Sequence, residues 1–373
     1  MNDGHGVLSR AARVVTSGEG PYPALAEEPD IVKFVRLDAA HYHGAYEPAS
    51  YDPWHAKQVF EETIEEAIDA EAFGWDGFFF TEHHFDAWSL VPSPNILLAA
   101  LAVKTRRMRL GTGVHIFPVH DPIRLAEEAG MLDVLSGGRL EFGVGRGNFH
   151  YELDRFTAPK QESVPRFDEN LDVFTKAINV HSFAYDGRWT KVRKTSTIFP
   201  RPLQKSLPIW IGASSPATVE KVAQLGHNLA AHPDRGERLE RFVEASRKAG
   251  RTVSGANYAA LVSLFVAPTD AEAERIALDA AKSSSDVASR RLDPVNDGPA
   301  AAFWTTEGFM KAAVFGSPRT VHDKLASILD ACGARRLLAI VRFTNMPTEI
   351  ARQTQRLFAE EVAPRLRTLK VKA

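Results

Sequence analysis

The strongest constraint on the fold is an alternation, from residue 31 onward, of short apolar runs with segments that carry apolar residues at helical spacing. The eight apolar runs lie at 31–35, 77–81, 108–114, 139–145, 208–213, 227–231, 259–267 and 336–341. Each run is nearly continuous instead of alternating between apolar and polar residues, as is typical of parallel strands that helices cover. The pattern therefore predicts eight parallel strands.

Helical periodicity fills the intervals between these runs. The predicted helices span 57–73, 94–104, 122–135, 166–181, 215–225, 236–250, 270–283, 317–332 and 348–368. Eight strand–helix units in one chain favour a closed eight-stranded parallel β/α (TIM) barrel of the α/β class over an open sheet. We expect one domain over 31–373 with inserts near 182–207 and 284–313. A mobile arm over 1–30, rich in Gly, Pro and Glu, is expected to precede it.

The composition excludes several classes of protein. The 373 residues include 45 basic and 47 acidic ones, both signs are interspersed, and the formal charge is −2, so the charge pattern of a nucleic-acid binder is absent. No apolar stretch approaches the roughly 20 residues of a membrane helix, and we recognise no secretory signal at the N-terminus. The single cysteine, Cys332, rules out an internal disulfide and is typical of a buried core residue. We expect a cytoplasmic protein.

Polar residues gather where the predicted strands end, and in β/α barrels the active site is built at these carboxyl ends. Strand by strand, these residues are His41 and His43; Glu82, His83 and His84; His115 and His120; Arg146, Asn148 and His150; Ser214, Ser215 and Thr218. The second strand is a run of aromatics, Phe78 to Phe80. We expect this run to fill the barrel and its polar end to face a ligand, because adjacent titratable groups at the end of an apolar strand are costly without partners.

The fifth of these strand ends has the character of an anion site. In "GASSPATVEKVA", Gly212 and small hydroxyl residues precede a predicted helix, whose free N–H groups and dipole favour a phosphate. Arg146, at the neighbouring strand end, strengthens this interpretation, because an anion between a guanidinium and a helix N-terminus removes their repulsion. Ser214 or Ser215 would also serve as an ordinary helix N-cap, so that alternative stays open. The nearby "GVGRGN" (143–148) does not fit a dinucleotide-binding loop, since its spacing is G-x-G-x-G and no predicted helix begins on it.

The histidines at the strand ends raise the question of a metal site. His83 and His84 are adjacent, so their side chains diverge on an extended backbone. No H-x-H pair on a strand, no H-E-x-x-H motif and no evident carboxylate ligand set accompany Glu82, His115 and His120. A metal-dependent hydrolase is therefore the less favoured interpretation, and we predict no metal site.

Several motifs together resemble the bacterial luciferase-like flavin monooxygenases. They are "GWDGFFFTEHHF", "VPSPNILLAALAVKTRRMRLGTGV", "HDPIRLAEEAGMLDVLSGGRLEFGVGRG", "RPLQKSLPIWIGASSPATVE" and "LFAEEVAPRLR". The likeness covers about residues 31–368, and the family fold is an eight-stranded β/α barrel. The resemblance thus implies the same fold as the strand pattern.

The resemblance implies a cofactor, reduced FMN, which lies across the carboxyl ends of the strands and uses O₂ as co-substrate. The residues that match the family's phosphate site are Arg146, Ser214, Ser215 and Thr218, with Gly212 beside them. His83 matches the family's proton-handling histidine, supported by Glu82 and His84. The Gly113–Val114 bond matches a position under the flavin ring where the family often has a cis peptide. The expected walls of a dry substrate pocket are His41, His43, Phe79, Phe85, Trp88 and Phe117.

The resemblance also implies partners. Because no dinucleotide fingerprint is present, NAD(P)H is expected to be used by a separate flavin reductase. Family members are mostly dimers, so we expect a homodimer. A deazaflavin-dependent oxidoreductase on the same barrel and a non-catalytic flavin-binding protein are the alternatives. The segment "RFTNMPTE" (342–349) replaces the Gly-Gly-Met-Pro sequence of many members, and the pair His41 and His43 is not a general family feature. The substrate of a relative therefore does not transfer to this chain.

Overall fold

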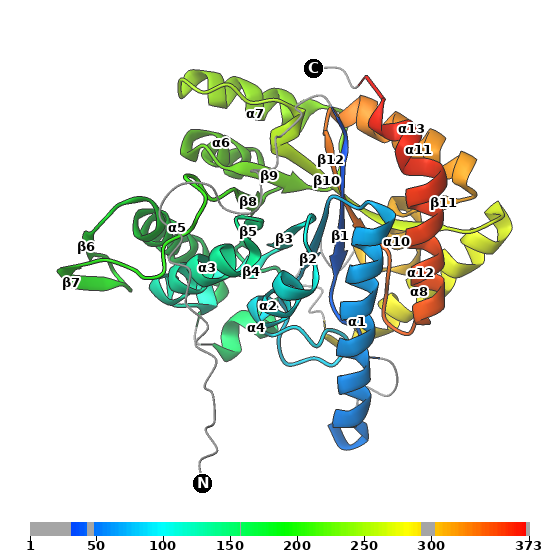
Figure 1. The fold of residues 1–373 in the computed structure, drawn as a ribbon, viewed down its shortest axis with the longest axis horizontal. Helices are drawn as coiled ribbons and strands as arrows, with labels where there is room; N and C mark the ends of the chain where they lie inside the picture. Colours follow the sequence, from blue (N-terminus) through cyan, green and yellow to red (C-terminus); the bar gives the residue numbers. More distant parts are fainter. Residues whose placement is uncertain (1–30, 43–47, 157, 292–302, 371–373) are drawn as a thin grey trace, which may run out of the picture.

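The computed structural model describes residues 31–42, 48–156, 158–291 and 303–370 (Figure 1). The predicted mobile arm over 1–30, the side chain of His43 and residues 292–302 of the second predicted insert lie outside the described residues.

Eight parallel strands close into a barrel at the centre of the molecule (Figure 1). They are β1 (Lys33–Asp38), β2 (Gly77–Phe80), β3 (Arg109–Thr112), β5 (Leu140–Gly145), β8 (Ile209–Gly212), β9 (Asn228–Ala231), β10 (Tyr258–Val266) and β12 (Arg336–Ile340). Neighbours pair in this order, and β12 pairs with β1, which closes the ring. The predicted eight-stranded parallel β/α barrel is confirmed.

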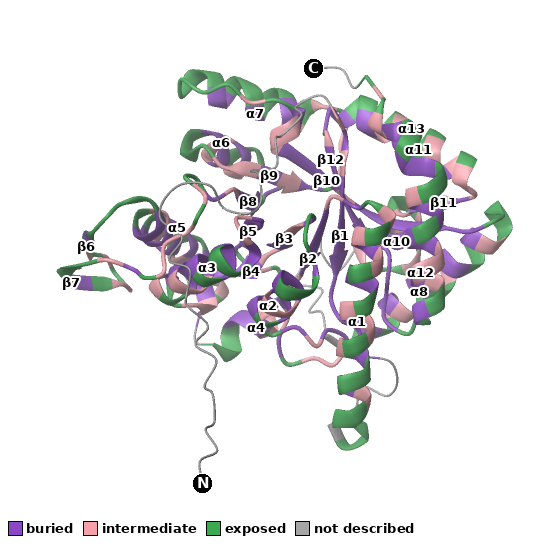
Figure 2. Cartoon of the chain, viewed as in Figure 1, coloured by how far each residue is buried: buried purple, intermediate pink, exposed green. Residues whose placement is uncertain are grey.

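Helices cover the outside of this ring. They are α1 (Pro53–Phe73), α2 (Pro94–Lys104), α3 (Pro122–Ser136), α5 (Ser163–Asn179), α6 (Pro216–Leu225), α7 (Glu237–Lys248), α8 (Asp270–Arg291), α11 (Pro318–Cys332) and α12 (Thr348–Leu357). A π-helical turn (Phe358–Val362) and α13 (Ala363–Arg367) continue α12. Figure 2 shows the strands largely buried and the outer faces of the helices exposed. The main hydrophobic core therefore lies between the barrel and the helices.

Shorter elements decorate the barrel. The first predicted insert contains an antiparallel hairpin, β6 (Phe183–Asp186) and β7 (Lys191–Ser196). The two-residue strand β4 (His115–Ile116) pairs with β5, and β11 (Val314–Gly316) pairs with β10. Other short helices are α4 (His150–Arg155) and α10 (Thr306–Ala312). In the second predicted insert, α8 continues past the predicted helix end at residue 283 as far as Arg291.

The aromatic run of β2 divides between two sides of the barrel wall, because successive strand residues point to opposite faces. Phe79 packs inside the barrel with Val35, Leu37 and Leu338. Phe78 and Phe80 belong instead to the outer core beneath the helices. The expectation that the whole run fills the barrel was therefore wrong for two of its three residues.

A buried carboxylate closes the amino-terminal end of the barrel. Glu141 accepts hydrogen bonds from Arg109 Nε (2.9 Å), Arg336 Nη1 (2.7 Å) and Trp210 Nε1 (2.6 Å). Burial alone would raise the pKa of Glu141, but Arg336 and Arg109 outweigh it and hold the pKa below its usual value. These ion pairs occupy the amino-terminal end of the barrel, so the opposite, carboxyl end is the place for a ligand.

Candidate active site

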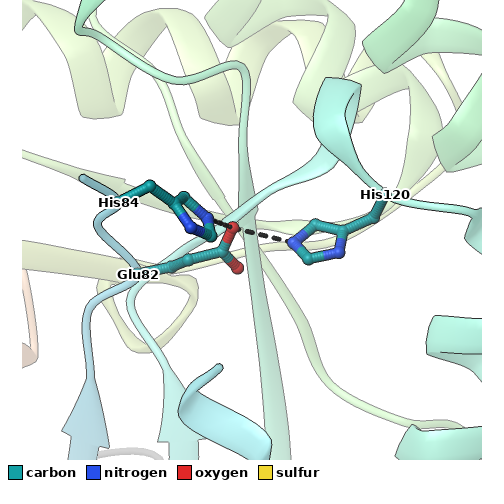
Figure 3. Close-up of side chains that lie close together, drawn as sticks. All are labelled: Glu82, His84 and His120. Atoms are coloured by element: carbon teal, nitrogen blue, oxygen red, sulfur yellow. Dashed lines mark hydrogen bonds and ion pairs between the residues drawn. The ribbon is translucent and has the colours of Figure 1, made fainter. Parts of the chain in front are cut away.

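Glu82, just beyond the end of β2, is the centre of a buried hydrogen-bonded cluster. Its Oε1 lies 2.9 Å from His84 Nε2 and 2.7 Å from His120 Nε2, and its Oε2 lies 2.6 Å from His115 Nδ1. Figure 3 shows His84 and His120 converging on the carboxylate from opposite sides. His115 continues the cluster, since its Nε2 lies 3.0 Å from the side-chain oxygen of Asn95. Glu82 is 2% exposed whereas the His120 side chain is partly exposed, so the carboxylate itself is shielded from water but the cluster reaches the surface at His120.

The protonation state of Glu82 follows from its partners. Burial by itself raises the pKa of this carboxyl, but hydrogen bonds from His115, His120 and His84 hold the pKa well below its usual value. An ionised carboxylate only accepts hydrogen bonds, so each facing imidazole nitrogen carries the proton. Burial also lowers the pKa of His115, against the opposing effect of Glu82. The cluster fixes the tautomers of His84 and His120 around one negative charge.

The same side chains present the geometry of a candidate metal site, because ligand atoms of Glu82, His84 and His120 lie within 4.8 Å of one another. Two ligands of one tetrahedral zinc ion are roughly 3.3 Å apart. Here the imidazole nitrogens are only 2.7 and 2.9 Å from the carboxylate oxygen, which are hydrogen-bond distances. Sequence spacing missed this convergence, since His120 comes from another strand end. The separations fit shared protons better than a shared metal ion.

His83 points away from this cluster, as expected for neighbours on an extended chain. Its Nδ1 lies 3.1 Å from Glu152 Oε1, and the same oxygen accepts the backbone N–H of His84 at 2.9 Å. Glu152 is on the short helix α4 and is 1% exposed. Its second oxygen is buried and has no hydrogen-bond partner among the described residues. The carboxylate that orients His83 is thus Glu152, whereas Glu82, expected in this role, bonds to His84.

Glycines bring the backbone around the Gly113–Val114 bond close to β5. This peptide bond is cis, as the family resemblance implied. A Cβ on Gly143 would lie 1.9 Å from the carbonyl oxygen of Thr112, and a Cβ on Gly145 would lie 2.6 Å from Val114 Cγ2. The "GVGRG" motif is therefore needed for close backbone packing, which agrees with the rejection of a dinucleotide loop.

The residues predicted to hold a phosphate lie at two adjacent strand ends. β5 pairs with β8 through Val144 and Ile211, so Arg146 and the first turn of α6 follow neighbouring strands. Ser215 is the N-cap of α6, and its hydroxyl bonds to the N–H and hydroxyl of Thr218 at 3.3 and 2.8 Å. The N-cap alternative is therefore realised. It does not exclude the phosphate interpretation, because the side chain of Arg146 is exposed and has no ion-pair or hydrogen-bond partner among the described residues.

An aromatic hollow opens beside His83. We define the aromatic hollow by its lining residues His41, Trp88, Phe149, Tyr151, Ser284, Val287, Ala288, Trp304, Phe343 and Thr344. The rings of Trp88 and Phe149 lie 4.5 and 5.4 Å from the His83 ring, centroid to centroid. The hollow and the candidate proton-handling residue therefore share two walls.

The structure distributes the other predicted pocket residues differently. Phe117 is fully buried among core aromatics, including Phe142 and Phe174, and does not line the hollow. Phe85 is 51% exposed with φ +59°, and its ring packs on Phe156. Ser214 is exposed. Of the predicted wall residues, His41 and Trp88 line the hollow.

Several site residues escaped the sequence reasoning. Glu152 follows the fourth strand in the segment "GRGNFHYE" (145–152), where the sequence analysis singled out only Arg146, Asn148 and His150. His150 instead pairs with Asp154 on its own helix at 2.7 Å. Ser284 belongs to the far end of α8, where the sequence shows only a polar helical pattern. A helix face that lines a cavity carries no sequence signal distinct from one that faces solvent.

A parallel β/α barrel with titratable side chains gathered at the carboxyl ends of its strands is the architecture of a barrel enzyme. The family model described as luciferase-like monooxygenase matches residues 36–336. The chain therefore belongs to the luciferase-like monooxygenase family, a family of oxidoreductases, and the predicted membership is confirmed.

Individual relatives agree with this assignment. The oxygenase component of the flavin-dependent trigonelline monooxygenase of Acinetobacter baylyi is 28% identical over 289 residues, which cover 72% of this chain and 80% of that protein. The uncharacterised protein y4vJ of Sinorhizobium fredii is 41% identical over 172 residues, 46% of this chain. That match spans only about half of the relative, 49% of its length. The crystal structure of the monooxygenase RslO1 from Streptomyces bottropensis superposes with a TM-score of 0.77 at 26% identity, over 89% of this chain and 99% of that one.

Within the described residues, no helix is long and apolar enough to cross a membrane.

Proposed function

We propose that this protein is a flavin-dependent monooxygenase that uses reduced FMN and O₂ to oxygenate a small organic substrate. The observation that carries the proposal is the exposed guanidinium of Arg146, which has no partner among the described residues and follows the strand next to the one that leads into α6, at the same barrel end as His83 and the aromatic hollow. An anion-binding end, a proton-handling residue and an apolar hollow are the three parts that such a reaction needs.

The donor set fits the phosphate of FMN. The backbone N–H of Ala217, the hydroxyl of Ser214, the one hydroxyl proton that the Ser215–Thr218 bond leaves over and the Arg146 side chain are proposed to donate to phosphate oxygens, at the positive end of the α6 dipole. The surroundings of Gly212, beside these donors, are open. A Cβ built on Gly212 would lie 3.8 Å from its nearest atom, Val114 Cγ1. Bound reduced FMN would supply the activation of O₂. The backbone of Gly113 and Val114 is proposed to support its ring.

The residues of this chain orient groups, move a proton and exclude water. Glu152 holds His83 Nδ1–H, which leaves Nε2 as the nitrogen that takes or gives a proton. Glu82 and His84 act through position: their hydrogen bond fixes the chain on either side of His83. Trp88 and Phe149 pack on the His83 ring and limit water on that side.

A separate reductase is proposed to supply the reduced flavin from NAD(P)H. This is supported by the relative named an oxygenase component and by the absence of a dinucleotide fingerprint in the chain. We further propose a homodimer, on the family resemblance alone, and a cytoplasmic location, on the single cysteine.

Flavin binding and oxygen consumption test the proposal. Purified protein should quench the fluorescence of FMN on titration, and should bind FMN more tightly than riboflavin because only FMN carries the phosphate. Oxygen uptake with photoreduced FMN should exceed that of free FMN when a substrate is present. Turnover with reduced deazaflavin F420 and none with FMN would replace the proposal by a deazaflavin-dependent oxidoreductase. FMN binding without oxygenation of any aldehyde, sulfonate, amine or phenol would favour a non-catalytic flavin-binding protein.

A further inference from the structure

We propose that the aromatic hollow receives an uncharged, flat aromatic substrate that carries a hydroxyl or N–H group, such as a phenol. This inference rests on the proposed function, because it takes the hollow beside His83 as the place of the acceptor substrate. It goes beyond that function by naming the chemical class of the substrate and two groups that select it, His41 and Ser284.

The walls favour a flat ring. Three side chains, His41, Trp88 and Phe343, have similar orientations: the His41 ring stacks at 5.5 Å and 28° with Trp88, and at 6.3 Å and 21° with Phe343. Phe149 and Tyr151 stack on each other at 5.9 Å and 11° on α4 and its approach. Aligned rings offer flat surfaces on which an aromatic ring packs over its full face. A flexible alkyl chain would gain less from such walls, because it must give up more rotational freedom to lie against them.

His41 supplies a hydrogen-bond acceptor in this apolar setting. Its Nδ1 lies 2.5 Å from the carbonyl oxygen of Trp88, and a carbonyl only accepts, so Nδ1 carries the proton. Nε2 is then unprotonated and has no hydrogen-bond partner among the described residues. Burial lowers the pKa of His41 to about 4, so the ring is neutral at pH 7. The free lone pair can accept from an O–H or N–H of a ligand.

Ser284 supplies a second polar group. It is 1% exposed and lines the hollow, and its hydroxyl has no hydrogen-bond partner among the described residues. A buried hydroxyl without a partner is costly, and a ligand oxygen would remove that cost. A phenolic oxygen can donate to His41 and accept from Ser284 at the same time.

Charged ligands are disfavoured. Among the described residues that line the hollow, none carries a carboxylate, an ammonium or a guanidinium group. A ligand carboxylate would therefore lose its hydration without a counter-charge. A quaternary cation could stack on the rings, but it has no N–H or O–H for His41 and no acceptor for Ser284.

The loop after β12 lines part of the hollow with a residue, Thr344, in an unusual backbone conformation. Thr344 lines the hollow with φ +29°, a conformation that favours glycine and is rare for a β-branched residue. Its hydroxyl bonds to Ser283 on α8 at 2.6 Å, which ties the loop to the helix that carries Ser284. Backbone strain at a ligand-lining residue is typical of functional constraint.

The aromatic hollow lies across the barrel mouth from the predicted phosphate site, where an acceptor substrate would be expected. His41 follows β1, and Phe343 and Thr344 follow the neighbouring β12, whereas Ser215 follows β8. β8 is four strands from β1 in either direction around the ring. A phosphate held at the end of β8 and a substrate held near β1 would therefore lie on opposite sides of the barrel mouth.

The test is calorimetric binding to the flavin-free protein, so it does not depend on turnover. We would titrate 2-naphthol, its isostere 2-methylnaphthalene, 2-naphthoate, N-methylquinolinium and decanal, with the protein in the syringe for the poorly soluble hydrocarbon. 2-Naphthol should bind roughly 5-fold or more tightly than 2-methylnaphthalene, the worth of about one buried hydrogen bond. 2-Naphthol and 2-methylnaphthalene should both bind more tightly than the ions 2-naphthoate and N-methylquinolinium, and more tightly than decanal. Equal affinity for naphthol and methylnaphthalene, or tightest binding of an ion or of decanal, would overturn the proposal.

Two variants locate the contacts. Ser284→Ala and His41→Phe should each weaken 2-naphthol binding about 5-fold and leave 2-methylnaphthalene within 2-fold. Ser246→Ala is the matched control, since Ser246 is also buried with an unpartnered hydroxyl but does not line the hollow. It should bind both ligands as the parent does. Unchanged naphthol preference in both pocket variants would overturn the assignment, and circular dichroism would confirm that each variant is folded.

The two proposals can fail separately. If the naphthol series behaves as expected but FMN does not bind, the flavin function fails and the hollow remains a phenol site. If FMN binds and supports oxygenation only of non-aromatic substrates, the proposed function stands and the substrate class is wrong.

Discussion

Removing the Arg146 guanidinium offers the sharpest test of the phosphate site, because the side chain is exposed and has no partner among the described residues to be disturbed. Two unit charges about 4 Å apart attract with ~1 kcal/mol in water and ~4 kcal/mol near a protein surface. Arg146 is exposed, so the lower part of this range applies. A phosphate of nearly two charges then gives about 2 kcal/mol, which corresponds to a roughly 30-fold weaker affinity.

We therefore expect Arg146→Ala to raise the Kd of FMN about 30-fold and to leave the Kd of riboflavin within 2-fold. Fluorescence titration of both flavins against parent and variant measures the four constants. Arg193→Ala is the control, because Arg193 is exposed on β7 in the hairpin insert and its loss should change neither Kd. An equal loss for FMN and riboflavin would refute the reasoning, because it would mean that Arg146 contacts the ring or supports the fold. Raising the salt concentration from 0.05 to ~0.5 M should shrink the effect, as expected of a screened surface contact.

Three further predictions concern the catalytic cluster, a buried histidine and the glycine-rich strand. His83→Ala should bind FMN as the parent does but form oxygenated product ~10²- to 10⁴-fold more slowly, and unchanged product formation by mass spectrometry would exclude His83 as the proton-handling residue. Burial lowers the pKa of His41 to about 4 from 6.5, so its contribution to stability is complete above pH 6.5 and falls as the pH drops towards 4. The free energy of unfolding, measured by urea titration, should fall by about 2 kcal/mol through this group when the pH is lowered from 7.5 to 5. His41→Phe should abolish that part of the decrease. Gly145→Ala places a Cβ 2.6 Å from Val114 Cγ2 and should cost about 2 kcal/mol in unfolding free energy, whereas Gly212→Ala, with its nearest atom at 3.8 Å, should cost well under half as much.

Buried ion pairs tie the chain together at both ends of the barrel. Arg342 joins the loop after β12 to helices α1 and α12 through Glu66 at 2.7 Å and Thr348 at 3.1 Å. Glu141 closes the opposite end with two arginines. Because buried ion pairs tie the chain at both ends of the barrel, the segments that carry the aromatic hollow and the Glu82 cluster are anchored to the rest of the fold.

The sequence by itself determined the barrel and its polar end. Eight apolar runs recur between helical patterns, and burial of a parallel strand on both faces forces nearly continuous apolar residues, so periodicity alone predicted every strand of the ring. The rule that function lies at the carboxyl ends of barrel strands then singled out Glu82, His83 and Arg146. Helix ends were predicted less well: α8 runs on to Arg291 because its polar pattern continues without a stop signal.

Only the tertiary structure decided which of these side chains meet. Glu82 bonds to His84, His115 and His120, while His83 takes Glu152 as its partner, because side chains of adjacent residues leave the chain in opposite directions. The aromatic hollow joins residues after β1, β2, β5 and β12 with one face of α8, and no local pattern marks such a meeting. Hydrogen-bonded side chains that lie far apart in the sequence are brought together by strand order and barrel closure. A linear pattern of polar and apolar residues does not encode that pairing.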